Sequence, residues 1–362
     1  MSEQAGIAPL ALGPLRRGTA GLWICAVLLV AAMIGALALG PVSIAPGHVL
    51  AILYDWMTGA RPVGESATRE AIIVLDIRLP RMILGAMVGA SLAVSGVLLQ
   101  GVFRNPLADP TFVGVSPGAA LAAVGFIVFG GGVAAGAQDL PARFGLMFSA
   151  FFGSLLTTVV LHRLAVHEGR TSVAALLFTG IALGALASAG TGVMLFVASD
   201  QQLREFTFWS LGSLGGATWI KVAIFAPFAA LSFLIAALLA RGLDAIALGE
   251  AEAFHLGIHV ERLKRFAIVA VAAGAGGSVA VAGMIGFVGL VIPHLLRLMI
   301  GPSHRKLMIG SALLGAAILA ASDVIARTAA SPAELPLGVV TAFLGAPFFL
   351  WLLRRNRAAL GA

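Results

Sequence analysis

The sequence predicts an all-α polytopic membrane protein with ten transmembrane helices and an inverted internal repeat. Of its 362 residues, 60% are apolar and 11% are charged, whereas soluble domains average about 45–50% and about 25%. The 45 glycines suit helices that pack closely in a membrane. A single cysteine, Cys25, excludes an internal disulfide. We therefore expect one transmembrane domain over residues 1–362.

The predicted spans follow from long apolar runs, because about 20 apolar residues cross a bilayer. In chain order they are residues 22–40, 82–103, 113–131, 144–162, 173–198, 220–240, 266–284, 286–299, 307–326 and 336–353. Helix-start residues support three of these spans. Ser116 before Pro117 predicts an N-cap, Thr171 and Ser172 open the fifth span, and Pro336 opens the tenth.

The distribution of Lys and Arg predicts the orientation of the chain. With ten spans both termini lie on the same side, and 15 of the 23 Lys and Arg fall on that side against 8 on the other. Positive residues collect on the cytoplasmic side, so both termini are expected there. The net charge of +7 then reflects membrane topology, and we expect lipid contacts and no nucleic-acid partner.

One short sequence recurs in the two halves of the chain. The segments Gly89–Leu98 and Gly276–Ile285 share five of ten positions, and Pro106 and Pro293 are separated by the same offset. The first copy lies in span two and the second in span seven, so the copies cross in opposite directions. Inverted repeats of this kind are typical of transporters. We expect helices 2–5 to repeat as helices 7–10.

Several function classes are disfavoured by what the sequence lacks. It contains no G-x-x-x-x-G-K-[ST] motif, and no histidine pair sits at ligand spacing inside a span. Asp323 is the main acid inside a span, and it lies near one end. A secondary carrier usually keeps ionisable groups at the midplane. A carrier or a membrane enzyme subunit is therefore the weaker hypothesis, and we expect a permeation path driven by a partner, with no enzyme activity of its own.

A charged segment at residues 241–265 separates the sixth and seventh spans. Residues 244–256 are predicted to be helical and to end at Gly257. One interpretation is an ordinary solvated loop. The other is a short docking helix for a cytoplasmic motor, with a charged face and glycines at its turns.

This segment also carries a family resemblance. "GEAEAFHLG" (Gly249–Gly257) resembles the cytoplasmic coupling segment of permease subunits of iron-complex and vitamin B12 ABC importers. Four further motifs resemble the same family in order, namely "RLPR" from Arg78, "RNPLADPTFVGVSPGAAL" from Arg104, "GFVGLVIPHLLR" from Gly286 and "ELPLGVVTAFLGAPFFLWLL" from Glu334. Within the family, "GEAEAFHLG", "VERLKR" and "SPAELPLG" look most like the haem permeases.

The resemblance implies a type II importer in the bacterial inner membrane. It implies a homodimer, two copies of a cytoplasmic ATP-binding subunit and a periplasmic substrate-binding protein. The cargo would be an iron complex, haem first and then a ferric siderophore or cobalamin. No resident cofactor and no metal site are expected.

The resemblance also assigns roles to particular residues. ATPase coupling is expected from Gly249, Glu250, Ala253 and Gly257, the alternative for Glu250 being a solvated loop acid. A cytoplasmic gate is expected from Asn105, Pro106, Leu107, Thr171 and Ser172, with plain helix capping a compatible reading for the last two. Docking of the binding protein is expected from Arg78, Arg81 and Arg327.

Other readings of these and neighbouring residues stay open. Arg78 and Arg81 could be interfacial anchors, and Arg327 could pair with Asp323 four residues earlier. His294 matches a histidine found across the family whatever the substrate, so we do not expect a haem ligand there. Methionines in the spans are expected to pack and not to bind haem; they are Met87, Met194 and Met284.

Overall fold

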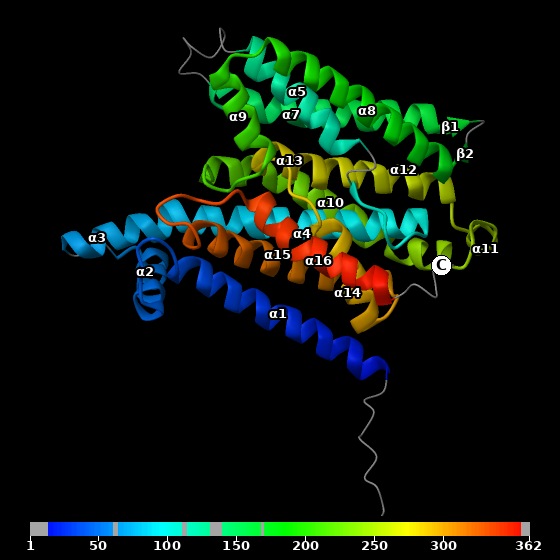
Figure 1. Cartoon of the computed structure of the whole chain (residues 1–362). Helices are drawn as coiled ribbons and strands as arrows, with labels where there is room; N and C mark the ends of the chain where they lie inside the picture. Colours follow the sequence, from blue (N-terminus) through cyan, green and yellow to red (C-terminus); the bar gives the residue numbers. More distant parts are fainter. Residues whose placement is uncertain (1–13, 61–63, 111–113, 131–139, 168–169, 356–362) are drawn as a thin grey trace, which may run out of the picture.

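The computed structural model describes residues 14–60, 64–110, 114–130, 140–167 and 170–355. Within them, ten apolar helices form a bundle (Figure 1). They are α1 (Pro14–Ala38), α4 (Leu79–Phe103), α5 (Val115–Phe129), α7 (Leu140–Ala165), α8 (Val173–Val197), α10 (Trp219–Ile246), α12 (Val260–Val271) continued by α13 (Gly277–Ala282), α14 (Val288–Ile300), α15 (His304–Thr328) and α16 (Leu337–Arg355).

By length and composition, seven of these helical stretches can cross a membrane, and α5, α14 and most of α16 are shorter apolar helices. Together they account for the ten predicted spans. The predicted ends at residues 113 and 131 lie outside the described residues. The expected N-cap at Ser116 is wrong, because α5 already begins at Val115 after Gly114, whose φ is 75°.

Short elements connect the ten helices. These are α2 (Pro46–Thr58), α3 (Glu65–Ile72), the π-helical turn η1 (Ile73–Arg78), the antiparallel pair β1 (Val166–His167) and β2 (Arg170–Thr171), α9 (Asp200–Ser210), α11 (Glu250–His255) and the π-helical turn η3 (Ala272–Gly276). The two-residue strands are the only departure from an all-α fold in the described chain. The turn η3 joins α12 to α13 without breaking the span.

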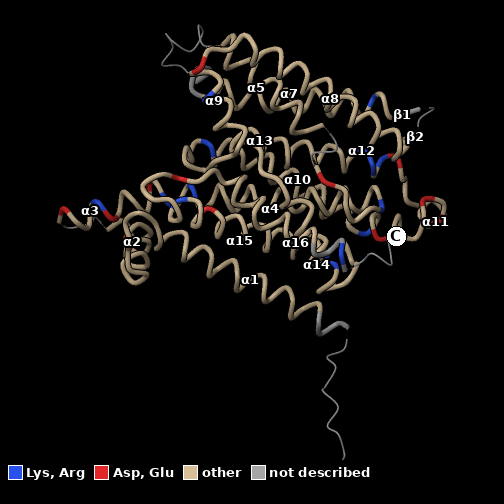
Figure 2. Tube along the Cα trace, in the orientation of Figure 1, with Lys and Arg blue, Asp and Glu red and all other residues tan. Residues whose placement is uncertain are grey.

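The bundle has two ends, and its charged residues gather at them (Figure 2). We call them the α3 end and the α11 end, after the element that stands outermost at each. The described part of α1 begins at the α11 end and that of α16 finishes there (Figure 1). Both described ends of the chain therefore lie on one side of the bundle, as an even number of spans requires.

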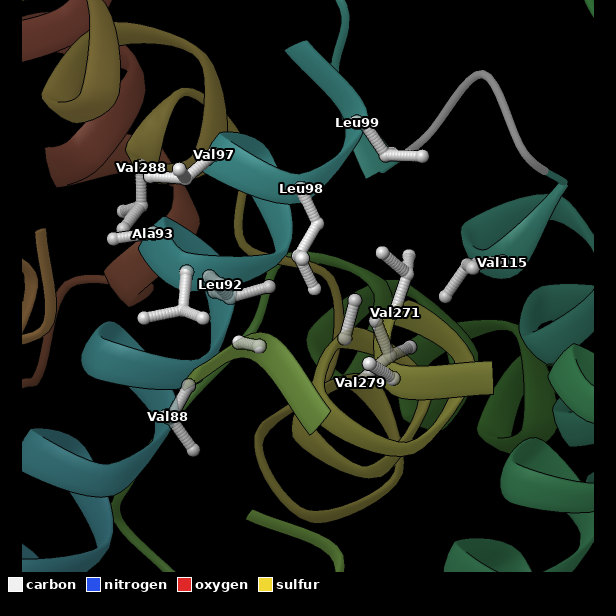
Figure 3. Packing of buried hydrophobic residues seen from close by; sticks show 14 of the residues in the cluster. Val88, Leu92, Ala93, Val97, Leu98, Leu99, Val115, Val271, Val279 and Val288 are labelled. Carbon is white, nitrogen blue, oxygen red and sulfur yellow. The ribbon is translucent and has the colours of Figure 1, made fainter. Parts of the chain in front are cut away.

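The helix α4 forms the centre of the bundle. In the most apolar stretch of the helix that contains it, 83% of residues are buried, as are 83% in α12–α13, against 11% in α8. Figure 3 shows α4 side chains beside Val288 of α14 and beside Val271 and Val279 of α12 and α13. Strongly apolar sequences thus form both the central helices, which protein surrounds, and the peripheral helix α8, which leaves an apolar face open.

Glycine allows α4 to approach its neighbours closely. A Cβ atom at Gly96 would lie 1.8 Å from the carbonyl oxygen of Gly289 on α14. Similarly, a Cβ atom at Gly89 would lie 2.2 Å from the carbonyl oxygen of Gly315 on α15. Small residues at both contacts bring backbones together, which is how membrane helices gain packing energy.

The repeated segments run in opposite directions, since α4 passes from the α3 end to the α11 end and α12–α13 returns (Figure 1). Their local structures differ. The first copy is wholly helical, whereas the second leaves the helix at Gly283, whose φ is 72°. Pro106 follows α4 in a loop and Pro293 lies inside α14, so the two prolines are not equivalent.

Candidate functional site

The charged segment at residues 241–265 contains parts of three helices. The helix α10 continues to Ile246, α11 covers Glu250–His255 and α12 begins at Val260. The predicted uninterrupted helix over 244–256 is therefore wrong. The break falls at Gly249, whose φ of 142° lies outside the range that residues with a side chain favour.

The end of α11 has the geometry that the sequence predicts. Gly257 has a φ of 81°, and its N–H donates to the Phe254 carbonyl. The N–H of Ile258 donates to the carbonyl of Ala253, which completes a Schellman motif. Ala253 is fully buried, so α11 has one face against the bundle while Phe254 is 68% exposed on the other. The helix is thus a short, fixed element that presents an outer face.

The first residue of α11 is tied to the interior by a buried lysine. Lys264 is 1% exposed, and its Nζ donates to Glu250 Oε2 at 2.9 Å and to the Thr171 carbonyl at 2.9 Å. Glu261 completes the group, because Oε2 accepts from both the N–H and the Oγ1 of Thr171. The structure thereby joins Glu250, a predicted coupling residue, to Thr171, a predicted gate residue.

The other predicted gate residues make local contacts. Ser172 is the N-cap of α8, and its Oγ accepts from the N–H of Ala175. The helix α4 ends with Arg104 at a φ of 48°, and Asn105 Oδ1 accepts from the N–H of Leu107 at 2.9 Å. Pro106 lies within that turn. Among the described residues, Asn105, Pro106 and Leu107 make no hydrogen bond with Thr171 or Ser172.

The three arginines predicted to dock a partner lie at the α3 end, and all are less than a tenth exposed. Arg78 donates to the carbonyls of Leu37, Ala38 and Val42, and Arg327 donates to that of Ala36. The carbonyls of Ala36, Leu37 and Ala38 lie in the last turn of α1 and have no partner within the helix, whereas Val42 lies in the loop that follows. The two cations satisfy these carbonyls and stabilise the negative end of the helix dipole.

Arg81 is occupied by two acids. Its Nη2 lies 2.9 Å from Asp323 Oδ1, and its Nη1 lies 2.9 Å from Glu334 Oε1. The pairing of Arg327 with Asp323, which the sequence offered as the alternative reading, is present at 3.4 Å. Glu334 lies in the loop before α16, and its hydrogen bonds from Arg81 hold its pKa below the usual range. All three arginines thus have partners within the described chain.

Lys264 and Glu261 were not singled out by the sequence motifs, although one signal was present. Lys264 shares a helical face with Ala267, Ile268 and Val271, all of which are buried. A lysine in line with core residues is unusual and indicates a paired cation. His294 has no polar partner on either ring nitrogen, and no cluster of potential metal ligands occurs among the described residues.

The comparisons with known proteins agree with this architecture. The hemin transport system permease protein HmuU of Yersinia pestis is 44% identical over 299 residues, covering 82% of this chain and 88% of the relative. The cobalamin import system permease protein BtuC of Halobacterium salinarum is 43% identical over 283 residues, covering 78% and 73%. A solved inward-facing metal-chelate type ABC transporter superposes with a TM-score of 0.79 at 30% identity, covering 92% of this chain and 98% of the other.

The fold and the two charged ends are those of a polytopic membrane permease. The chain belongs to the FecCD transport family, which matches residues 28–355.

Proposed function

We propose that the chain is the membrane-spanning subunit of an ATP-driven importer that carries haem from the periplasm to the cytoplasm. The proposal rests on the position of α11, a short helix at one end of the bundle. Lys264 holds its first residue, Glu250, and also binds the Thr171 carbonyl just before α8. Family membership over residues 28–355 supports the importer class. The 44% identity to a hemin permease supports haem, and cobalamin and ferric siderophores are the alternatives.

Energy enters this system through a separate chain. We infer that the α11 end faces the cytoplasm, that two ATP-binding subunits contact α11 of two copies of this chain, and that Glu250, 44% exposed, contributes to that contact. Gly249 and Gly257 set the position of α11, and Ala253 anchors it. The membrane involved is the bacterial inner membrane.

A homodimer supplies the passage. The helix α8 leaves an apolar face open, with Phe178, Ile181 and Phe196 each more than 60% exposed. We infer that two such faces meet around the path, and that Asn105, Pro106, Leu107, Thr171 and Ser172 narrow it at the α11 end. A large apolar chelate crosses best where contacts are weak, since tight sites would retain it.

The binding protein is proposed to dock at the α3 end through Arg78, Arg81 and Arg327. Their present partners constrain how this can happen. Carboxylates of the docking protein would have to take over contacts now made by Glu334 or by the carbonyls that end α1. Ion pairs of this kind set the association rate and the register more than the affinity.

The test is uptake by proteoliposomes that contain the chain, its ATPase and a binding protein loaded with haem, a ferric siderophore or cobalamin. We expect ATP-dependent haem uptake that stops with a hydrolysis-dead ATPase and falls with Glu250→Ala. Glu205→Ala, which removes an exposed acid at the opposite end of the bundle, is the matched control. Uptake of another chelate alone would reject haem. Uptake that does not depend on ATP and is abolished by an uncoupler would establish a secondary carrier instead.

A further inference from the structure

The buried cation Lys264 joins three separate elements at the α11 end. It lies one turn into α12, and its Nζ donates to Glu250 Oε2 of α11 at 2.9 Å, to the Thr171 carbonyl of β2 at 2.9 Å and to Glu261 Oε1 at 3.3 Å. An ammonium group has three N–H donors and no acceptor. All three donors of Lys264 are therefore used, and each points to a different residue.

Thr171 is held at every polar atom it has. Its N–H and its Oγ1 donate to Glu261 Oε2 at 2.8 Å and 2.6 Å, and its carbonyl accepts from Lys264. It is 4% exposed, and the next residue is the N-cap of α8. A displacement of Lys264 and Glu261 must therefore displace the start of α8 as well.

Glu250 is the only member of this group that reaches the outer surface to a large extent. Its side chain is 44% exposed, against 32% for Glu261 and 2% for Lys264. It is also the first residue of α11, directly after the Gly249 break. A force on α11 can thus reach Lys264 through Glu250, and the break at Gly249 separates α11 from α10.

We propose that Lys264 is a positioning residue that transmits the movement of α11 to the N-terminus of α8. This inference rests on the proposed function, because it assumes that an ATPase moves α11. Without the ammonium group, the carboxylates of Glu250 and Glu261 would repel each other and the Thr171 carbonyl would lose its donor. The movement of α11 would then no longer be passed on, and ATP would be hydrolysed with little transport.

The experiment measures uptake and ATP hydrolysis on the same proteoliposomes, and the ratio of the two is the readout. Lys264→Met removes the charge and keeps the apolar stem. Arg262→Met, two residues earlier on an exposed side chain, removes the same charge as a control. We expect uptake per ATP to fall at least tenfold in Lys264→Met and to change less than twofold in Arg262→Met. A purely structural role predicts a lower unfolding temperature with an unchanged ratio, and that result would overturn the inference.

Glu250→Gln keeps the test decisive if Lys264→Met does not fold, because the Glu250 side chain is partly exposed and its loss leaves Lys264 paired with Glu261. It should also lower the ratio, and the double variant should be no worse than Lys264→Met alone. Additive losses would contradict a shared path. If the wild-type protein transports and both variants keep its ratio, the inference alone fails. If the wild-type protein transports no chelate with ATP, the proposed function fails and the inference falls with it.

Discussion

Arg81 and Asp323 lie 242 positions apart in the chain and form a buried ion pair at the α3 end. Two nitrogens of Arg81 contact the carboxylate, and the remaining donors reach Glu334. The pair fixes α4 to α15, and Glu334 adds the loop that leads into α16. Three parts of the fold thus meet at one guanidinium group.

Removing Asp323 should destabilise the protein strongly. Asp323→Ala leaves a buried cation without its main partner, and losses of roughly 3–5 kcal/mol are typical of such changes. Glu334→Ala is the comparison. Its side chain is 41% exposed, so water screens the pair and about 1 kcal/mol or less is expected. Thermal unfolding in detergent measures the stability of both variants. Equal losses of stability would contradict the expectation that Asp323 contributes more than Glu334.

The Glu334 carboxylate should make stability depend on pH in acid. Hydrogen bonds from Arg81 lower its pKa in the folded chain, while burial opposes them. A lowered folded pKa stabilises the folded state above the unfolded pKa of about 4.3, and this contribution is lost as pH falls through the folded value. We expect the difference in unfolding temperature between the wild type and Glu334→Gln to be constant from pH 7 to about 5. It should vanish in stronger acid, and a loss already near pH 6 would assign the effect to another group.

The sequence predicts the ten spans well because a long apolar run indicates a helix that can cross the lipid bilayer. It predicts their ends less well where charged residues are buried by pairing. The seventh span was expected from residue 266, yet α12 begins at Val260, because Lys264 is neutralised by Glu250 and Glu261. The burial of Arg81 likewise depends on Asp323, far along the chain. No local pattern identifies such a partner, so the sequence suggested a docking role for Arg81 without revealing its ion pair with Asp323.

Glycine at the α4–α14 contact should be essential for stability. In Gly96→Ala the new Cβ would lie 1.8 Å from the Gly289 carbonyl, a backbone atom that moves only if the helices separate. Overpacking of this kind costs about 1–3 kcal/mol. Gly47→Ala is a suitable control, since it lies in α2 with no atom within 4 Å of an added Cβ. The unfolding temperature should fall for Gly96→Ala and not for Gly47→Ala. An unchanged unfolding temperature for Gly96→Ala would show that α4 and α14 do not pack closely at Gly96.

The turn after α11 should tolerate only residues that accept a positive φ. Gly257 has a φ of 81°, with no atom within 4 Å of an added Cβ, so backbone conformation and not crowding limits the substitution. Asn adopts the left-handed region at little cost, whereas a β-branched residue does not. We expect Gly257→Asn to keep uptake per ATP close to wild type and Gly257→Val to lower it several-fold, because a distorted turn shifts α11 against its ATPase. Copurification of the ATPase with each variant reports the same contact independently. If Gly257→Val binds the ATPase and transports as well as Gly257→Asn, the position of α11 does not depend on this turn.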